Sequence, residues 1–172
     1  MKNFVIGLVV GVLLLPVLAF VYIWLGYAPV ATAAPPLPLE RTLAATALHA
    51  RIAKEAPKSS PVPPSEPNLL AGATLYRTHC AVCHGTLGEP RTAIAKGMFP
   101  RPPQLVEGKG VTDDPVGETF WKAANGIRLT GMPGYRGSLT DEQLWQVSQL
   151  LANADKLPPG VRALLVQPPP AH

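Results

Sequence analysis

Cysteine is scarce in this chain of 172 residues, in which Cys80 and Cys83 are the only two. Two thiols are too few for the disulfide framework that holds many small secreted domains together. A structural zinc site needs four ligands, and His49, His79 and His172 form no second closely spaced pair. A redox disulfide of the thioredoxin type requires a βαβ context, and the sequence indicates none.

Several other patterns are missing as well. No segment alternates apolar and polar residues between turn signals, so no β-strand is predicted. Without a Ser/His/Asp pattern, a phosphate-binding glycine loop or paired carboxylates, no separate catalytic site is predicted. Between residues 68 and 158, nine Lys/Arg face eight Asp/Glu, a net charge of +1. Because no basic stripe interleaved with aromatic side chains is present, nucleic-acid binding is not expected.

The two cysteines stand in the stretch Cys80-Ala81-Val82-Cys83-His84, which has the spacing of a c-type haem attachment sequence. Positions i and i+3 share one face of a helical turn, so both thiols can add to the two vinyl groups along one porphyrin edge. His84 then lies where its imidazole can reach the iron as the proximal ligand. We therefore expect one covalently bound haem c per chain, with a redox disulfide and half a zinc site as the alternatives.

Charge is missing from Phe4 to Leu25, a run of 22 residues. As a helix this run is about 33 Å long, against a hydrocarbon core of about 30 Å. We expect residues 1–26 to form a single-pass anchor in the inner membrane, with the N-terminus in the cytoplasm and the haem domain in the periplasm. A cleaved signal peptide is the alternative, because residues 31–33 (Ala-Thr-Ala) have the form of a cleavage site.

Proline is abundant between residues 27 and 67, where it occupies nine of 41 positions. This density excludes regular helix and central strand over most of the segment, which we interpret as a linker. Residues 39–56, rich in Ala, Leu, Arg and Lys, are predicted to form one helix within it. The helix is either a semi-rigid spacer or a docking helix for a partner or for the following domain. Its predicted apolar stripe is weak and consists of Leu43, Ala47, Ala50 and Ala53.

Residues 68–158 are predicted to form a helical haem domain. Asn68 is a candidate N-cap for a first helix over residues 69–79. A later helix over residues 115–125 is expected to be capped by Asp114 and ended by Gly126.

A closing helix is expected to begin after Thr140, which has Gln143 three residues later in a capping-box pattern, and to run to about residue 154. The loop over residues 85–114 is long for a compact domain, and we expect it to wrap the prosthetic group. The tail over residues 159–172 is expected to be irregular.

These residues resemble class I monohaem cytochromes c over residues 68 to about 157. The resemblance rests on the attachment sequence, the helix before it and residues 125–135, Asn-Gly-Ile-Arg-Leu-Thr-Gly-Met-Pro-Gly-Tyr. In that family a methionine in a loop after the third helix supplies the sixth iron ligand. The closing helix packs across the first helix near a Gly/aromatic contact, and Gly72 and Tyr76 match that pattern.

The whole chain is similar to membrane-anchored cytochromes c of proteobacteria. The resemblance implies an all-α fold: a class I cytochrome c-like domain preceded by a single transmembrane helix and a proline-rich linker that contains a helix.

Two internal methionines are candidates for the sixth ligand. Met132 is the expected ligand, because Gly131 lets the backbone approach the porphyrin and Pro133 stiffens the loop. The alternatives are Met98 or no strong sixth ligand, and we otherwise expect Met98 to pack as a core or haem-edge residue.

The sequence also suggests a role or location for four further residues. Arg128 is a candidate hydrogen-bond donor to a haem propionate, with an ordinary exposed arginine as the alternative. Trp121 and Trp145 are expected in the core, and His79 is expected at the surface.

These expectations favour a single-electron carrier that works between membrane or periplasmic redox partners. Histidine and methionine together fill both axial positions, which disfavours substrate chemistry at the iron. A fixed cytochrome subunit of a larger membrane oxidoreductase is the main alternative. A haem enzyme or gas sensor with an open iron position is the third, and Met132 argues against it.

Overall fold

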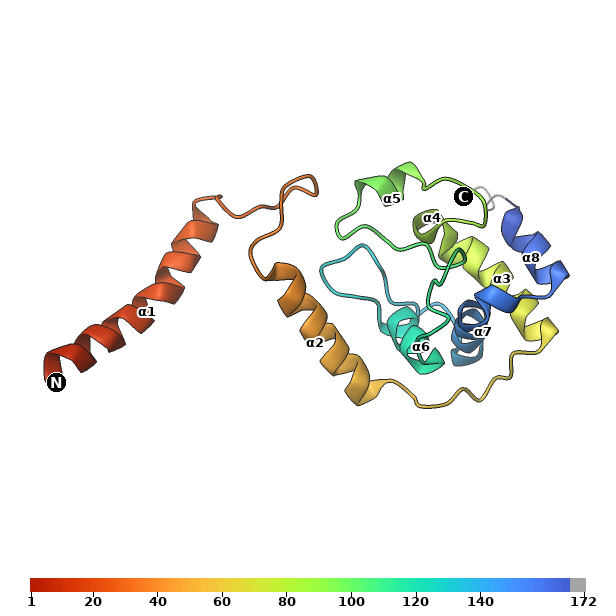
Figure 1. Ribbon diagram of the computed structural model, residues 1–172, viewed down its shortest axis with the longest axis horizontal. Coiled ribbons are helices and arrows are strands. Elements are labelled where there is room, and N and C mark those ends of the chain that lie inside the picture. Colours follow the sequence, from red (N-terminus) through yellow and green to blue (C-terminus); the bar gives the residue numbers. More distant parts are fainter. Residues whose placement is uncertain (168–172) are drawn as a thin grey trace. The chain divides into compact units, whose positions relative to one another are not determined.

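The structure is a computed structural model that describes residues 1–167 (Figure 1). The chain divides into two compact units, Met1–Leu43 and Ala44–His172. Every regular element within residues 1–167 is a helix and none is a strand, which confirms the predicted all-α class.

The first unit consists mainly of helix α1, Lys2–Trp24, whose 23 residues include no buried side chain. Pro16 lies inside α1 without ending it. The helix is long and apolar enough to cross a membrane, and a signal sequence would meet the same criterion.

Helix α2, Glu40–Glu55, lies within one residue of the predicted range at each end. Its predicted apolar stripe was wrong, because all four stripe residues are exposed. The buried residue of α2 is instead Ile52, which is 1% exposed and lies on the opposite face. The prediction failed because three alanines and one leucine on an exposed helix face can have the same spacing as residues on a buried face.

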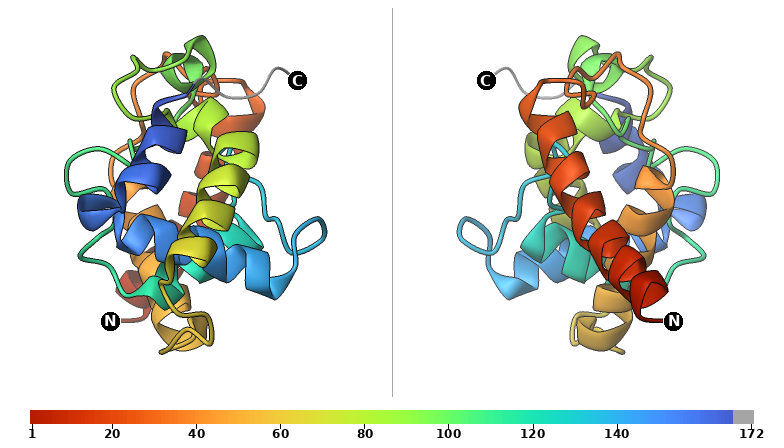
Figure 2. Two further views of the ribbon diagram at one scale, coloured as in Figure 1. Left: turned by 90° about the vertical axis from the view of Figure 1, so that its right-hand side faces the viewer. Right: turned by 90° about the vertical axis from the view of Figure 1, so that its left-hand side faces the viewer.

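Helix α3, Glu66–His79, crosses helix α7, Asp141–Ala152, at the centre of the haem domain (Figures 1 and 2). A Cβ atom on Gly72 would overlap the carbonyl oxygen of Gln146 and lie 3.2 Å from Leu150 Cβ. Only a glycine allows this close approach, and Tyr76 beside it is fully buried. The predicted Gly/aromatic crossing is therefore present.

The start of α3 differs from the prediction. Its N-cap is Ser65, three residues earlier than expected, and Pro67 lies in the first turn, where a missing N–H costs nothing. Asn68 lies inside the helix, and its side-chain amide donates to the carbonyl oxygen of Pro63 at 3.0 Å.

Helix α6, Val116–Asn125, packs on α7 through the rings of Phe120 and Trp145, whose centroids are 4.1 Å apart. Its N-cap is Pro115 rather than Asp114, whose carboxylate instead lies 3.3 Å from Lys122 Nζ. Gly126 ends the helix as predicted, with φ +68°.

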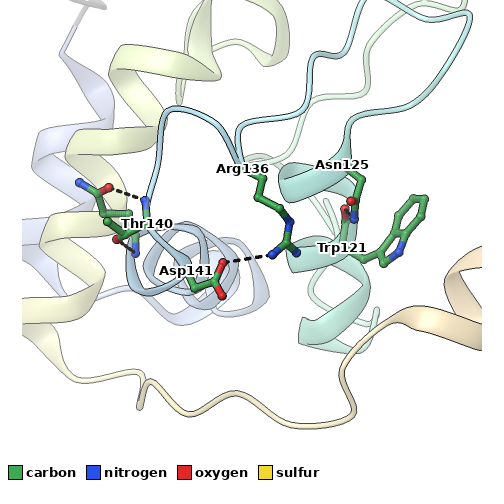
Figure 3. A network of polar contacts seen from close by, with 6 residues as sticks. Trp121, Asn125, Arg136, Thr140 and Asp141 are labelled. Carbon is green, nitrogen blue, oxygen red and sulfur yellow. Dashed lines mark hydrogen bonds and ion pairs between the residues drawn. The ribbon is translucent and has the colours of Figure 1, made fainter.

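The capping box that opens α7 is confirmed. Thr140 Oγ1 accepts from the backbone N–H of Gln143 at 3.2 Å, and Gln143 Oε1 accepts from the N–H of Thr140 at 2.9 Å. Arg136 adds an ion pair with Asp141 at 3.5 Å in the first turn (Figure 3). The start of α7 is therefore fixed by its own capping box and by the ion pair with Arg136, which follows α6 in the chain.

The predicted irregular tail is corrected by helix α8, Pro159–Val166, which packs against α3 (Figure 2). Val161 and Leu165 are fully buried, and they lie four residues apart on one helical face. This short helix had no signal in the sequence, because two apolar residues form a recognisable face only against α3. Residues 168–172 lie outside the described part of the chain.

The long loop over residues 85–114 contains one short helix, α5, Ala93–Gly97. Thr92 Oγ1 accepts from the N–H of Ala95 at 3.1 Å and donates to the carbonyl oxygen of Val82 at 2.7 Å. The remaining short elements are α4, Ala81–His84, and a 3₁₀ turn over Ala154–Lys156.

The proline-rich segment after α2 follows the surface of the haem domain. A Cβ atom on Gly117 of α6 would overlap the carbonyl oxygen of Pro57, so the two backbones touch. Gln149 Nε2 of α7 donates to the carbonyl oxygen of Val62 at 2.7 Å. Residues 57–62 are therefore part of the domain surface and do not extend away from it as a spacer.

Substitution of Gly72 by alanine should lower the free energy of unfolding of the haem-loaded protein by about 1–3 kcal/mol, because the added methyl must push α7 away. Urea unfolding followed by far-UV circular dichroism measures this loss. Gly137→Ala is the matched control, since nothing lies within 4 Å of its added Cβ. Equal losses in the two variants would contradict the crossing.

Candidate haem-binding site

The attachment sequence forms one helical turn directly after α3. The backbone N–H groups of Cys83 and His84 both donate to the carbonyl oxygen of Cys80, at 3.1 and 2.9 Å. Both cysteines are free and partly buried. The predicted geometry, with two thiols on one face followed by an imidazole, is therefore present.

A cavity of about 310 Å³ opens beside this turn. Cys80, Cys83 and His84 line it, and so do the two internal methionines, Met98 and Met132. The five side chains come from the turn after α3, from the loop before α6 and from the loop after α6. Within residues 1–167, no group of three or more His, Cys, Asp or Glu side chains is placed to hold a bare metal ion.

His84 is held in one orientation by a loop carbonyl. Its Nδ1 lies 2.8 Å from the carbonyl oxygen of Pro103. Because that oxygen can only accept, Nδ1 carries the proton and Nε2 keeps its lone pair for a metal. Burial lowers the pKa of His84 below its usual value, against an opposing effect of the Pro103 hydrogen bond. The neutral imidazole, which is the ligating form, is therefore favoured.

The Cys80 thiol is buried in apolar surroundings. Burial raises its pKa to about 12, and the neighbouring Cys83 adds to the shift. A thiolate here would lose its hydration without gaining a cation, whereas a thioether has no charge to desolvate. The environment of Cys80 therefore suits a thioether better than a free reactive thiol.

The loop that carries Met132 is closed on itself. The N–H of Ile127 donates to the carbonyl oxygen of Met132 at 3.2 Å, and the N–H of Met132 donates to Thr130 Oγ1 at 3.1 Å. The same hydroxyl donates to the carbonyl oxygen of Ile127 at 2.7 Å. These bonds fix the backbone at Met132 relative to the end of α6.

Tyr135 joins this loop to the attachment turn. Its hydroxyl donates to the carbonyl oxygen of His79 at 2.7 Å, one residue before Cys80. The ring of His79 lies against the ring of Tyr135, with centroids 5.7 Å apart. Burial raises the pKa of Tyr135 to about 12, so its hydroxyl stays a donor at neutral pH. The methionine loop and the attachment turn are thus directly connected.

Met98 lies beside Met132 in the cavity. A Cβ atom on Gly131 would overlap Met98 Cε, so Gly131 makes room for the Met98 side chain. The sequence-based argument gave a different reason for Gly131, namely approach of the backbone to the porphyrin. The contact with Met98 agrees with the expectation that Met98 packs at the cavity edge.

The other predicted residues lie in different places. Arg128 is exposed and is not among the cavity-lining residues of the described chain, so its role stays a prediction. Trp145 is buried, as expected. Trp121 is only half buried, and its Nε1 donates to Glu55 Oε2 of α2 at 3.2 Å. His79 lines the cavity instead of lying at the surface.

The cavity wall is mainly apolar and includes a few polar side chains. Thr119 is 7% exposed, lines the cavity and has a buried Oγ1 with no hydrogen-bond partner in the structure. Lys122 and Arg101 line the same cavity. An acidic substituent such as a propionate would satisfy the orphaned hydroxyl and match the charge of Arg101. By contrast, Lys122 Nζ already lies 3.3 Å from Asp114 and 3.6 Å from Glu118.

Sequence reasoning missed three residues of this site. Nothing in the pattern around Thr119 distinguishes it from any threonine on an amphipathic helix. Pro103 acts through its backbone carbonyl, which any residue supplies. Tyr135 stood in the segment that carried the resemblance, and an aromatic residue just after the methionine loop was the available signal.

Residues 67–151 match the sequence profile of a family described as cytochrome C oxidase, cbb3-type, subunit III. This segment, which holds the attachment turn and Met132, is a cytochrome c domain, and its family binds haem c covalently.

Among solved structures, the chain is similar to one from the reducing HAO-like protein complex of Kuenenia stuttgartiensis, with 22% identity and a TM-score of 0.49. The similarity covers 58% of this chain and 49% of that chain, so it spans about half of the neighbour's length. The comparison with curated proteins found no match.

Replacing Tyr135 by phenylalanine should destabilise the haem-loaded protein by about 1 kcal/mol, because the His79 carbonyl loses its donor. Amide exchange of residues 127–135 should become faster at the same time. Urea unfolding and hydrogen exchange monitored by mass spectrometry measure the two effects. Tyr27→Phe, at a side chain that is 67% exposed, serves as the control. Unchanged exchange in the loop would show that Tyr135 does not hold it.

Proposed function

We propose that this protein is a single-electron carrier with one haem c, in which His84 and Met132 are the axial ligands. One observation carries the proposal: the methionine loop and the attachment turn line one cavity and are joined by the bond from Tyr135 to His79. This arrangement supports an iron site that is closed on both faces.

Each residue then has a defined task. When bound, the haem supplies reversible one-electron chemistry. Cys80 and Cys83 retain it covalently, and Pro103 holds the ring of His84 with Nε2 free to ligate. Met132 occupies the sixth position and so excludes small ligands and substrates. Thr119 donates to a propionate, and Arg101 in the same cavity wall provides a counter-charge.

Partners of a carrier are other redox proteins at or near a membrane. The haem domain is near neutral, with nine cationic and eight anionic side chains over residues 68–158. Steering by charge is therefore weak, and the rate of association should depend only moderately on salt. If α1 is retained as an inner-membrane anchor with the domain in the periplasm, it confines the domain near membrane partners.

A fixed subunit of a membrane oxidoreductase is the second candidate. The matched family is described as an oxidase subunit, which favours this alternative. Solubilisation in mild detergent separates the two candidates, because a permanent subunit co-purifies in fixed stoichiometry and a carrier does not.

Met132→Ala should open the sixth iron position, allow carbon monoxide to bind and lower the reduction potential by on the order of 0.1 V or more, within the range of about 0.8 V that axial ligands span. Met98→Ala should leave the optical spectrum unchanged and have a much smaller effect on the potential. Spectroelectrochemical titration of both purified variants measures this. A spectrum altered in the Met98 variant alone would transfer the ligand role to Met98.

Membrane fractions should retain the haem-stained protein after a high-salt wash, because α1 has no charge over residues 4–25. Sequencing of the mature N-terminus provides the direct check. A mature start near Ala34 would instead indicate a cleaved signal peptide and a soluble periplasmic protein.

A further inference from the structure

The wall of the cavity includes residues from outside the segment that matches the cytochrome c family. That segment begins at residue 67. Leu48 and His49 of α2 nevertheless line the cavity together with Cys83, His84 and Met132. Helix α2 therefore contributes to the site itself.

The inward face of α2 is regular. Leu48 is half buried, Ile52 is 1% exposed, and Glu55 completes the row at spacings of four and three residues. Side chains with these spacings lie on one side of a helix. The opposite side carries the exposed stripe that includes Leu43, which is 66% exposed. The helix thus has an inner and an outer face.

The C-terminal end of α2 is fixed to α6. Glu55 uses both carboxylate oxygens: Oε2 accepts from Trp121 Nε1 at 3.2 Å, and Oε1 lies 2.6 Å from Arg51 Nη2. Figure 3 shows the indole of Trp121 projecting from α6 on the side away from Arg136. Two residues further on, the carbonyl of Pro57 lies against Gly117 in a contact that admits no Cβ.

The segment after α2 continues this attachment along the domain. Val62 is partly buried against the cluster formed by Phe120, Leu144 and Trp145. Its carbonyl oxygen accepts from Gln149 Nε2, which is itself part of a buried residue of α7. A tethered spacer would require none of these contacts, so they favour a helix held in place.

We propose that α2 is a built-in cover of the haem site, in which Leu48 and His49 form a wall that the cytochrome c domain alone does not supply. Leu48 keeps water from the enclosed group, and the inward face of α2 replaces solvent along that edge. Electrons then enter and leave by the part of the haem edge that α2 leaves open. This inference rests on the proposed function in one respect: its tests need a protein that has bound haem.

Leu48→Ala in the full-length, haem-loaded chain tests the cover. Removing the apolar wall admits water, which stabilises the more highly charged oxidised form, so the reduction potential should fall. Leu43→Ala is the matched control, being the same substitution on the exposed face of the same helix. The potential of the control should equal that of the unmodified protein.

Gly117→Ala provides an independent test, because Gly117 is not one of the cavity-lining residues and none of those residues is substituted. Its added methyl would overlap the Pro57 carbonyl and should detach the end of α2. We expect a fall in potential of the same sign as for Leu48→Ala. We also expect faster amide exchange in residues 44–55, which should be protected in the unmodified protein. Gly137→Ala again serves as the control.

Two results would overturn the proposal. One is a Leu48→Ala potential equal to that of Leu43→Ala. The other, which requires no variant, is amide exchange in residues 44–55 of the unmodified protein as fast as in a solvated helix. Neither result affects the ligand assignment, which the Met132 and Met98 variants test separately. Failure of covalent haem attachment in the unmodified protein would instead refute the proposed function.

Discussion

The structure depends on the close crossing of α3 and α7 at Gly72. With no side chain at that position, the backbone of α7 comes directly against α3, and Tyr76 and Leu150 fill the space beside the crossing with no exposure to solvent. This contact sets where α3 ends, and the attachment turn begins at that end. A wider crossing would displace Cys80, Cys83 and His84 together. The position of these three side chains of the candidate site thus follows from one missing methyl group.

Polar contacts then position the parts that the helices do not reach. The Pro103 carbonyl orients His84, Tyr135 holds the methionine loop to the carbonyl of His79, and Thr130 closes that loop. In each case one partner is a backbone group or a single hydroxyl on a loop. Surface loops are commonly mobile. Here, however, one loop is bonded to His84 through Pro103, and the methionine loop is bonded to His79 through Tyr135 and to itself through Thr130. These hydrogen bonds therefore fix loops that carry cavity-lining residues, including Met132.

The sequence predicted the parts that depend on local spacing. The attachment turn and the helix ends at Thr140 and Gly126 follow from patterns a few residues long, whereas the Gly72–Tyr76 crossing was expected only from the resemblance to class I cytochromes c. The sequence failed where a contact joins distant segments. On α2, the predicted stripe is exposed and Ile52 is buried because only the Ile52 face contacts other parts of the chain. The spacing of apolar residues in the sequence does not show which face makes such contacts. Helix α8 was missed for the same reason, because Val161 and Leu165 become a recognisable face only against α3. The roles of Thr119 and Pro103 had no sequence signal at all.

The cavity wall includes residues 48, 80–84, 98–103, 119–123 and 130–135, which are spread over more than half of the chain. No short contiguous fragment contains the complete wall. Contacts with such large separations form late, after the entropy of closing the intervening loops has been overcome. Covalent capture at Cys80 and Cys83, by contrast, needs only one helical turn. A chain that binds its prosthetic group through this turn would acquire an anchor around which the distant walls can assemble, so that attachment of the group would be coupled to the final stage of folding.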